Sequence, residues 1–170
     1  MQISACIADW DQLRKYQERY GQDMSWAGDW YRSDSFTDWN QSVRFNDAVG
    51  ELFLDIRETL PSEAARALEE FLVTFCPVVA DHSAFAAPQS PGIRHDAFYA
   101  ALAPDEVKRR LGLLEGVRLS DFFARVGEDL DQQADEVISN LREVVEFVFM
   151  WAAALGQAAS KRWGLVVIIY

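Results

Sequence analysis

The chain has 170 residues, half of them apolar and 13% aromatic, a composition that predicts one folded domain with a sizeable core and excludes a disordered chain. Acidic residues outnumber basic ones 27 to 16, giving a formal net charge of -11. A general basic surface for a phosphate backbone is therefore excluded, and no nucleic-acid partner is predicted.

Cysteine usage and apolar runs predict the compartment. The two cysteines, Cys6 and Cys76, form neither a disulfide framework nor a CxxC zinc motif. The first residues lack the basic start and apolar run of a secretion signal, and the longest apolar stretches, 144–155 and 165–170, are shorter than the roughly 20 residues of a membrane span. We expect a cytoplasmic protein that does not cross a membrane.

The first half of the chain predicts a strand followed by helices. Apolar and polar residues alternate over 2–8, which is typical of a strand, and Asp9 or Asp11 is then expected to cap a helix over 10–20. Apolar residues recur at helical spacing over 49–60, up to Pro61, and again over 62–75. These two segments predict a helical hairpin.

The second half begins after a long connection. Residues 77–96 contain three prolines and show no periodicity, which predicts a long loop within a single domain, 1–170. Helices are expected over 104–114, 120–127 and 129–159, and the last of them is apolar on nearly every side over 144–155. Residues 165–170 are β-branched and apolar and predict a buried strand.

These elements predict an α+β fold that is mostly helical. A buried terminal strand must pair its backbone groups, and the only other clear strand is 2–8. We therefore expect the two ends of the chain to meet in one small sheet, with the long helix through Val144 and Val148 packed across it.

The second half also resembles a known family. The run Ala101-Leu102-Ala103-Pro104-Asp105-Glu106-Val107, a long Ala-rich helix and the terminal strand 164–169 are similar to the YfbM-like family of uncharacterised bacterial proteins. The resemblance covers about residues 98–170. It implies an α+β fold with an N-terminal strand and a bacterial source, but no reaction and no site residues.

Two histidines in the predicted loop are the first candidate site. His82 follows Asp81 and His95 precedes Asp96, so two imidazoles and two carboxylates could hold a metal or supply a base. Adjacent residues usually point apart, however, and the gap between the histidines lacks metal-ligand spacing, so exposed loop histidines are the preferred interpretation. Cys76 ends a helix, where the helix dipole raises a thiol pKa, and is predicted to be buried rather than nucleophilic.

An aromatic segment is the second candidate. Trp26, Trp30 and Trp39 alternate with carboxylates, and such rings can surround a cation from a partner. They can equally cap the helical core, with their indole N–H groups donating to the carboxylates. Both interpretations remain open.

The third candidate is an acidic helix. Eight acids and two bases lie between Asp121 and Glu146. Like charges one turn apart repel, and a basic partner would relieve them. The predicted partner-binding acids are Glu128, Asp131, Asp135 and Glu136. The alternative is a solvated helix face that binds no partner, and it remains open.

The function predicted from these patterns is binding rather than catalysis. We expect an acidic inhibitor of the immunity type that engages a basic protein, with a toxin as the candidate partner, and no catalytic residues, metal or cofactor. The alternative is an enzyme or small-ligand-binding protein that uses His82 and His95 beside the aromatic segment 26–39.

Overall fold

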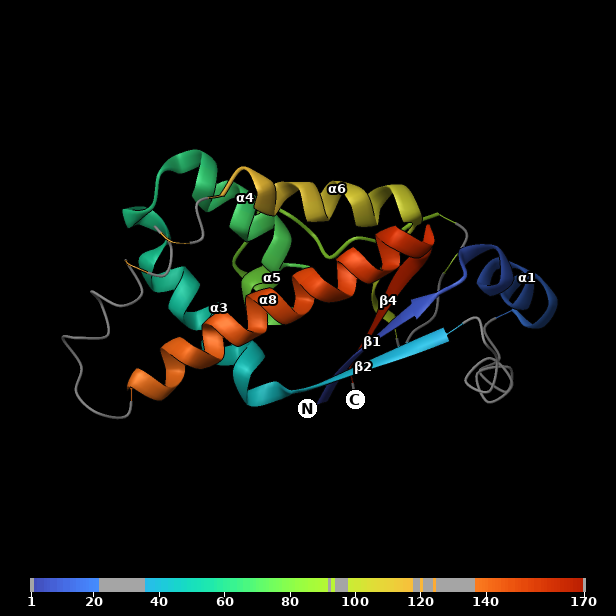
Figure 1. Ribbon diagram of the computed structural model, residues 1–170, viewed down its shortest axis with the longest axis horizontal. Coiled ribbons are helices and arrows are strands. Elements are labelled where there is room, and N and C mark those ends of the chain that lie inside the picture. The colour runs from blue at the N-terminus through green and yellow to red at the C-terminus, as the bar shows by residue number, and fades with distance from the viewer. Residues whose placement is uncertain are drawn as a thin grey trace.

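The two ends of the chain lie side by side in one four-stranded antiparallel sheet (Figure 1). The computed structural model describes residues 2–21, 36–91, 93, 98–117, 120, 124 and 137–169, with the backbone alone for 2–3, 36–48, 137–145 and 169. Strand β1 (Gln2–Ala8) pairs with β4 (Gly164–Ile169), with Ala5 opposite Val167. The predicted pairing of the N- and C-terminal strands and the α+β class are confirmed.

Two further strands flank this pair, giving the order β2-β1-β4-β3. Strand β2 (Phe36–Ser42) pairs with β1, and β3 (Phe98–Leu102) pairs with β4. The sequence analysis missed both, because β2 is largely polar and β3 is short and rich in alanine, a residue depleted in strands. These segments are strands because they pair with β1 and β4. Local strand propensity does not predict such pairing.

The helices agree with the sequence periodicity in most places. Asp9 caps the first helix, since its side chain accepts hydrogen bonds from the backbone N–H groups of Asp11 and Gln12 at 3.1 Å. The predicted loop 77–96 differs at its start, which is a short helix with Pro77 in its first turn. The expected helix 120–127 and the start of 129–159 fall largely outside the described residues. The helices are α1 (Trp10–Tyr20), α3 (Val43–Ile56) with the 3-10 turn η2 (Arg57–Thr59), α4 (Ser62–Leu72), α5 (Pro77–Asp81), α6 (Pro104–Glu115) and α8 (Val137–Lys161).

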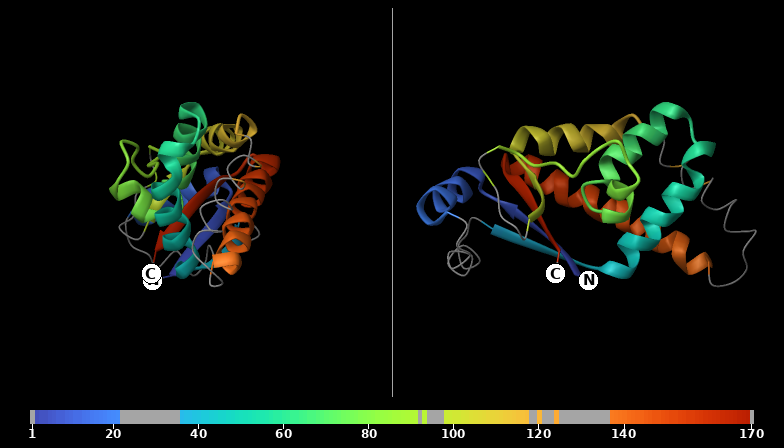
Figure 2. Two further views of the ribbon diagram at one scale, coloured as in Figure 1. Left: turned by 90° about the vertical axis from the view of Figure 1, so that its left-hand side faces the viewer. Right: turned by 180° about the vertical axis from the view of Figure 1, so that it is seen from behind.

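The sheet has an apolar core on each face. Helices α3, α4, α6 and α8 gather on one face (Figure 2), where the inward residues of the central strands pack against Val148, Trp151 and Leu155 of α8. On the other face, Trp10 and Leu13 of α1 pack against the strand residues whose side chains point to that face. These include Cys6, Ala8, Val166 and Ile168. Because β4 is central and covered on both faces, its sequence is an unbroken apolar run.

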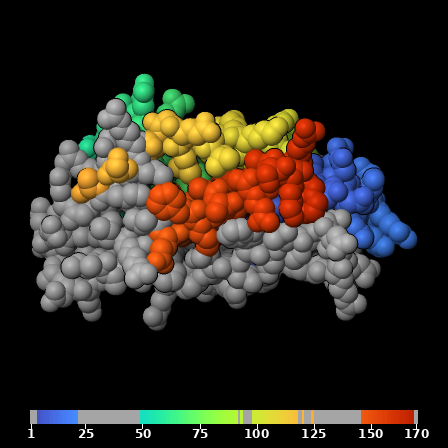
Figure 3. All heavy atoms as spheres, viewed as in Figure 1, coloured from blue at the N-terminus to red at the C-terminus, as the bar shows by residue number. Residues whose placement is uncertain are grey.

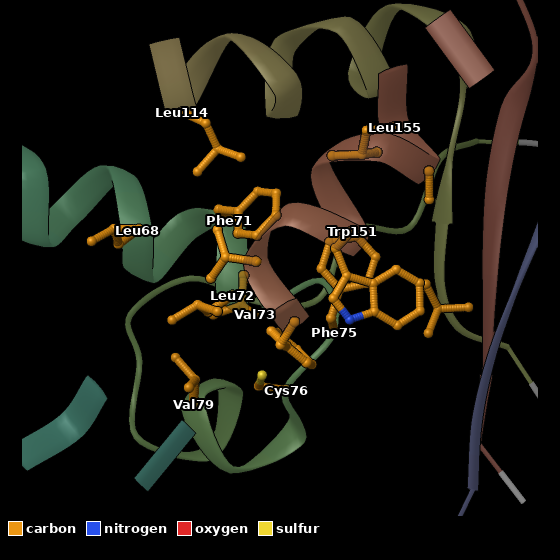
Figure 4. Close-up of a cluster of buried hydrophobic side chains, with 14 of the residues drawn as sticks. Leu68, Phe71, Leu72, Val73, Phe75, Cys76, Val79, Leu114, Trp151 and Leu155 are labelled. Atoms are coloured by element: carbon orange, nitrogen blue, oxygen red, sulfur yellow. The ribbon is translucent and has the colours of Figure 1, made fainter. Parts of the chain in front are cut away.

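Trp151 lies at the centre of the larger core (Figure 4). Its ring stacks on Phe75 with centroids 4.2 Å apart and meets the edge of Phe147 at 6.1 Å. The indole Nε1 is buried and has no hydrogen-bond partner among the residues that the structure describes. The long helix is thus anchored by one large side chain against the turn that follows α4.

Candidate functional site

Most of the site residues predicted from the sequence lie outside the described residues. These are Trp26, Trp30, His95, Asp96, Glu128, Asp131, Asp135 and Glu136. Trp39 lies in the middle of β2, opposite Ala5 of β1. The structure therefore does not test whether the aromatic segment binds a partner's cation or caps the core, and both remain predictions.

His82 is placed at the surface. It is exposed at the C-terminal end of α5, next to the exposed Asp81, and its backbone carbonyl accepts a 3.4 Å hydrogen bond from Arg57. Across the described part of the chain, no three His, Cys, Asp or Glu side chains come together in a way that could hold a metal ion. His82 is therefore exposed to solvent, and its hydrogen bond with Arg57 is made by the backbone carbonyl rather than by the imidazole.

We expect His82→Ala to change the free energy of unfolding by less than about 1 kcal/mol, because the contact to Arg57 uses the backbone and exposed substitutions have small effects. Thermal unfolding of the two proteins checks the stability. Elemental analysis of protein purified without chelators checks the metal content, and one equivalent of zinc, manganese or iron that disappears in His82→Ala would contradict the prediction.

The two cysteines are buried, lie in different cores and are not joined in a disulfide. Cys6 belongs to the core on the α1 face of the sheet, and Cys76 to the core on the opposite face. The predicted burial of Cys76 is confirmed. A thiol in these surroundings behaves as a small apolar side chain rather than as an accessible nucleophile.

One group of charged residues is compensated within the fold. Arg109 of α6 donates to both carboxylate oxygens of Glu106, at 2.8 and 2.7 Å, and to Oε1 of Glu70 on α4 at 2.6 Å. Arg110, which is 4% exposed, donates its Nε to the same Glu106 at 2.8 Å. This cluster joins α4 to α6, and its positive and negative charges neutralise one another within the fold.

The carboxyl group of Glu106 should make stability depend on pH. The hydrogen bonds from Arg109 lower its pKa, burial opposes them, and Arg110 lowers the pKa further. A lowered pKa in the folded state stabilises the protein above the unfolded-state pKa of about 4.3, and this contribution is lost as pH falls through the folded value. We expect Glu106→Gln to cost about 1 kcal/mol or more at pH 7, because it leaves the buried Arg110 without its charged partner. The difference from the wild type should shrink below about pH 4 in urea unfolding curves; a difference that is the same at pH 3 and pH 7 would show that the carboxylate charge is not involved.

A second group of acids, on α3 and η2, is not compensated. Glu51, Asp55 and Glu58 are exposed and follow one another at helical spacing, so they share one side of the segment. None of the three forms an ion pair with another described residue, and Arg57 between them contacts Glu69 at 3.9 Å instead. The sequence analysis missed these acids, although their spacing of four and three residues was the signal that could have found them.

Helix α3 packs against α8, the helix that follows the most acidic segment in the sequence. Helix α3 and the first turns of α8 lie at the end of the molecule opposite α1 (Figure 1 and Figure 2, right). Residues 118–136, with six acids and two bases, directly precede α8 in the chain. We call Glu51, Asp55 and Glu58 the acidic end.

Comparison with known proteins assigns no family. No family model matches the chain, and no curated protein or solved structure does. The resemblance to the YfbM-like family therefore stays a prediction based on its residues. Among the helices that the structure describes, α8 included, none is both long and apolar enough to span a bilayer.

Proposed function

We propose that this protein is a non-catalytic binding protein of the bacterial cytoplasm that captures a basic protein through its acidic end, as an inhibitor of the immunity type captures a toxin. The observation that carries the proposal is the contrast between its two groups of acids. Glu70 and Glu106 are paired with arginines inside the fold, whereas Glu51, Asp55 and Glu58 are exposed and form no ion pair with a residue in the described part of the chain.

Uncompensated acids on one helix side favour a basic partner for an electrostatic reason. Glu51 and Asp55 are one turn apart, and like charges at this spacing destabilise a helix by a few tenths of a kcal/mol. Lysine or arginine side chains of a partner would remove that repulsion. A field of one sign also speeds association, with the largest effect at low ionic strength.

The proposal includes the residues singled out in the sequence. Glu128, Asp131, Asp135 and Glu136 add four acids to the segment that leads into α8. Trp26, Trp30 and Trp39 supply aromatic faces for the partner's cations. The absence of a disulfide between Cys6 and Cys76 agrees with a reducing compartment.

The experiment begins with affinity capture of the partner from the producing organism, followed by association kinetics over a salt series. One variant carries Glu51→Gln, Asp55→Asn and Glu58→Gln, and a second carries the corresponding amides at Glu128, Asp131, Asp135 and Glu136. The matched control neutralises three exposed acids, Asp11 and Glu18 of α1 and Asp105 in the first turn of α6. Helix α1 lies at the end of the molecule opposite α3 (Figure 1).

We expect both acid-to-amide variants to slow association about tenfold at low salt and much less at high salt, while the control has little effect. Their thermal stability should be unchanged or slightly raised, because repulsion is relieved. An acidic partner would refute the proposal. Equal slowing by the control would also refute it, since the net charge rather than the acidic end would then set the rate.

A further inference from the structure

The edge of β3 is covered by the segment that precedes it in the chain. The backbone N–H of Ala101 donates to the carbonyl of Pro88 at 2.8 Å, and the carbonyl of Ala101 accepts from the N–H of Ser90 at 2.8 Å. Gln89 and Ala101 thus form a short parallel bridge. We call residues 85–91 the strap.

Two side chains of the strap complete this pairing. Nε2 of Gln89 donates to the carbonyl of Tyr99 at 2.7 Å, and Oγ of Ser90 accepts from the N–H of Ala103 at 2.8 Å. Tyr99, Ala101 and Ala103 alternate along the chain, so their backbone groups point to the same edge. The strap therefore satisfies four backbone groups there, two with its own backbone and two with side chains.

The strap is anchored on both faces of the sheet. Phe85 and Ala87 pack against the larger core, whereas the fully buried Ile93, just after the strap, belongs to the core on the α1 face. The chain thus passes around the edge of β3 from one face to the other. The end of β3 is also fixed, because α6 begins directly after Ala103 and lies at the surface beside α8 (Figure 3).

The composition of β3 explains why its edge needs a cover. Residues 98–104 contain no charged side chain. Natural proteins protect the edge of a sheet with charges, with proline or with a covering segment, because unpaired edge groups bind further strands. The strap itself ends the sheet, since Pro91 has no N–H with which another strand could pair.

The four groups under the strap are complementary to those of a second copy. If two β3 strands were antiparallel and centred on Ala101, the two Ala101 residues would exchange both of their hydrogen bonds. The N–H of each Ala103 would then donate to the carbonyl of Tyr99 in the other copy, as two-fold symmetry requires. A second β3 edge thus fits the groups that the strap occupies, and it brings no charge to them.

We propose that the strap is an autoinhibitory cover, which prevents β3 from pairing with β3 of a second copy. In two separate chains, each strap makes four hydrogen bonds to its edge, whereas the paired edges would make about half as many in all. The strap also avoids the entropy cost of association. The closed monomer is therefore favoured in the intact protein, and loosening the strap shifts the equilibrium toward the dimer. The proposed capture of a basic protein uses none of these backbone groups.

A release variant tests the proposal. It combines Gln89→Ala, Ser90→Pro and Ile93→Ser, which remove three of the four hydrogen bonds and one anchor. In sedimentation of the full chain from about 1 µM to about 1 mM, we expect the wild type to stay monomeric and the variant to dimerise with a dissociation constant below about 100 µM. The amides of Ala101 and Ala103 should exchange hydrogen rapidly in the dilute variant and slowly in the concentrated one.

The matched control places the same substitutions outside the strap. It carries Gln12→Ala on α1, Ile56→Ser in the larger core and Ser62→Pro at the first residue of α4, a position that accepts proline. This control loosens the fold without uncovering β3, so it should stay monomeric. Gln89→Ala with Ser90→Pro alone keeps Ile93 in the core, and it should shift association in the same direction as the release variant.

Ala103→Pro identifies the edge that pairs. The φ of Ala103 is -64°, which proline adopts without strain, and the substitution removes the N–H that would donate to the second copy. Added to the release variant, it should weaken the dimer about tenfold or more, because the two-fold axis doubles the loss.

Four results would overturn the proposal. They are a wild type that already dimerises, a release variant that stays monomeric with exposed edge amides, edge amides as protected in that variant as in the wild type, and a dimer that the control also forms or that Ala103→Pro leaves intact.

Discussion

Trp151→Ala is expected to lower the free energy of unfolding by about 3–5 kcal/mol, the usual cost of deleting a fully buried tryptophan. The substitution removes the stack on Phe75 and leaves a cavity between α8 and the turn after α4. Urea unfolding followed by circular dichroism measures the loss. A change below about 1 kcal/mol would contradict the central position of this ring in the core.

Trp151→Phe is the matched control for this experiment. A phenyl ring keeps the stack on Phe75 and removes the buried indole N–H, which has no hydrogen-bond partner. An unpaired buried donor costs about 1–3 kcal/mol, so its removal offsets part of the lost apolar contact. We expect Trp151→Phe to cost less than half as much as Trp151→Ala.

Gly164→Ala is expected to cost about 3 kcal/mol, since overpacking a dense core costs about 1–3 kcal/mol and here it also involves backbone. Gly164 begins β4, and a Cβ atom there would overlap the Trp10 ring and lie 2.6 Å from the Leu102 carbonyl oxygen. Trp10 is buried in the core on the α1 face, so its ring has little room to shift, and the carbonyl belongs to the paired strand β3. The strand and the helix on it therefore require glycine at this position.

Two comparisons check the Gly164 prediction. Gly112→Ala, in open space on α6, should raise stability by about 0.5–1 kcal/mol, which separates a steric effect from a general effect of glycine replacement. In a Trp10→Leu background, Gly164→Ala should cost less, because one of its two contacts is removed. Equal costs in both backgrounds would show that Trp10 does not restrict the site.

The candidate site could be predicted only in part. Acidity is a property of composition, and the spacing of Glu51, Asp55 and Glu58 is visible in the chain. Which acids are neutralised inside the fold is not visible, because Glu70 is 39 residues from Arg109 and reaches it only through the packing of α4 on α6. Only the tertiary structure shows which carboxylates are paired inside the fold and which are exposed to a partner.

The sequence by itself determined the longer described helices and the two central strands, but not the short helix α5. Helical periodicity, the Asp9 cap and the apolar run of β4 act locally, and the need to pair buried backbone groups places β1 beside β4. Only the tertiary structure decided the edges of the sheet. The polar residues of β2 and the alanines of β3 have little strand preference of their own, and they become strands because β1 and β4 each offer a free row of hydrogen-bonding groups to one neighbour.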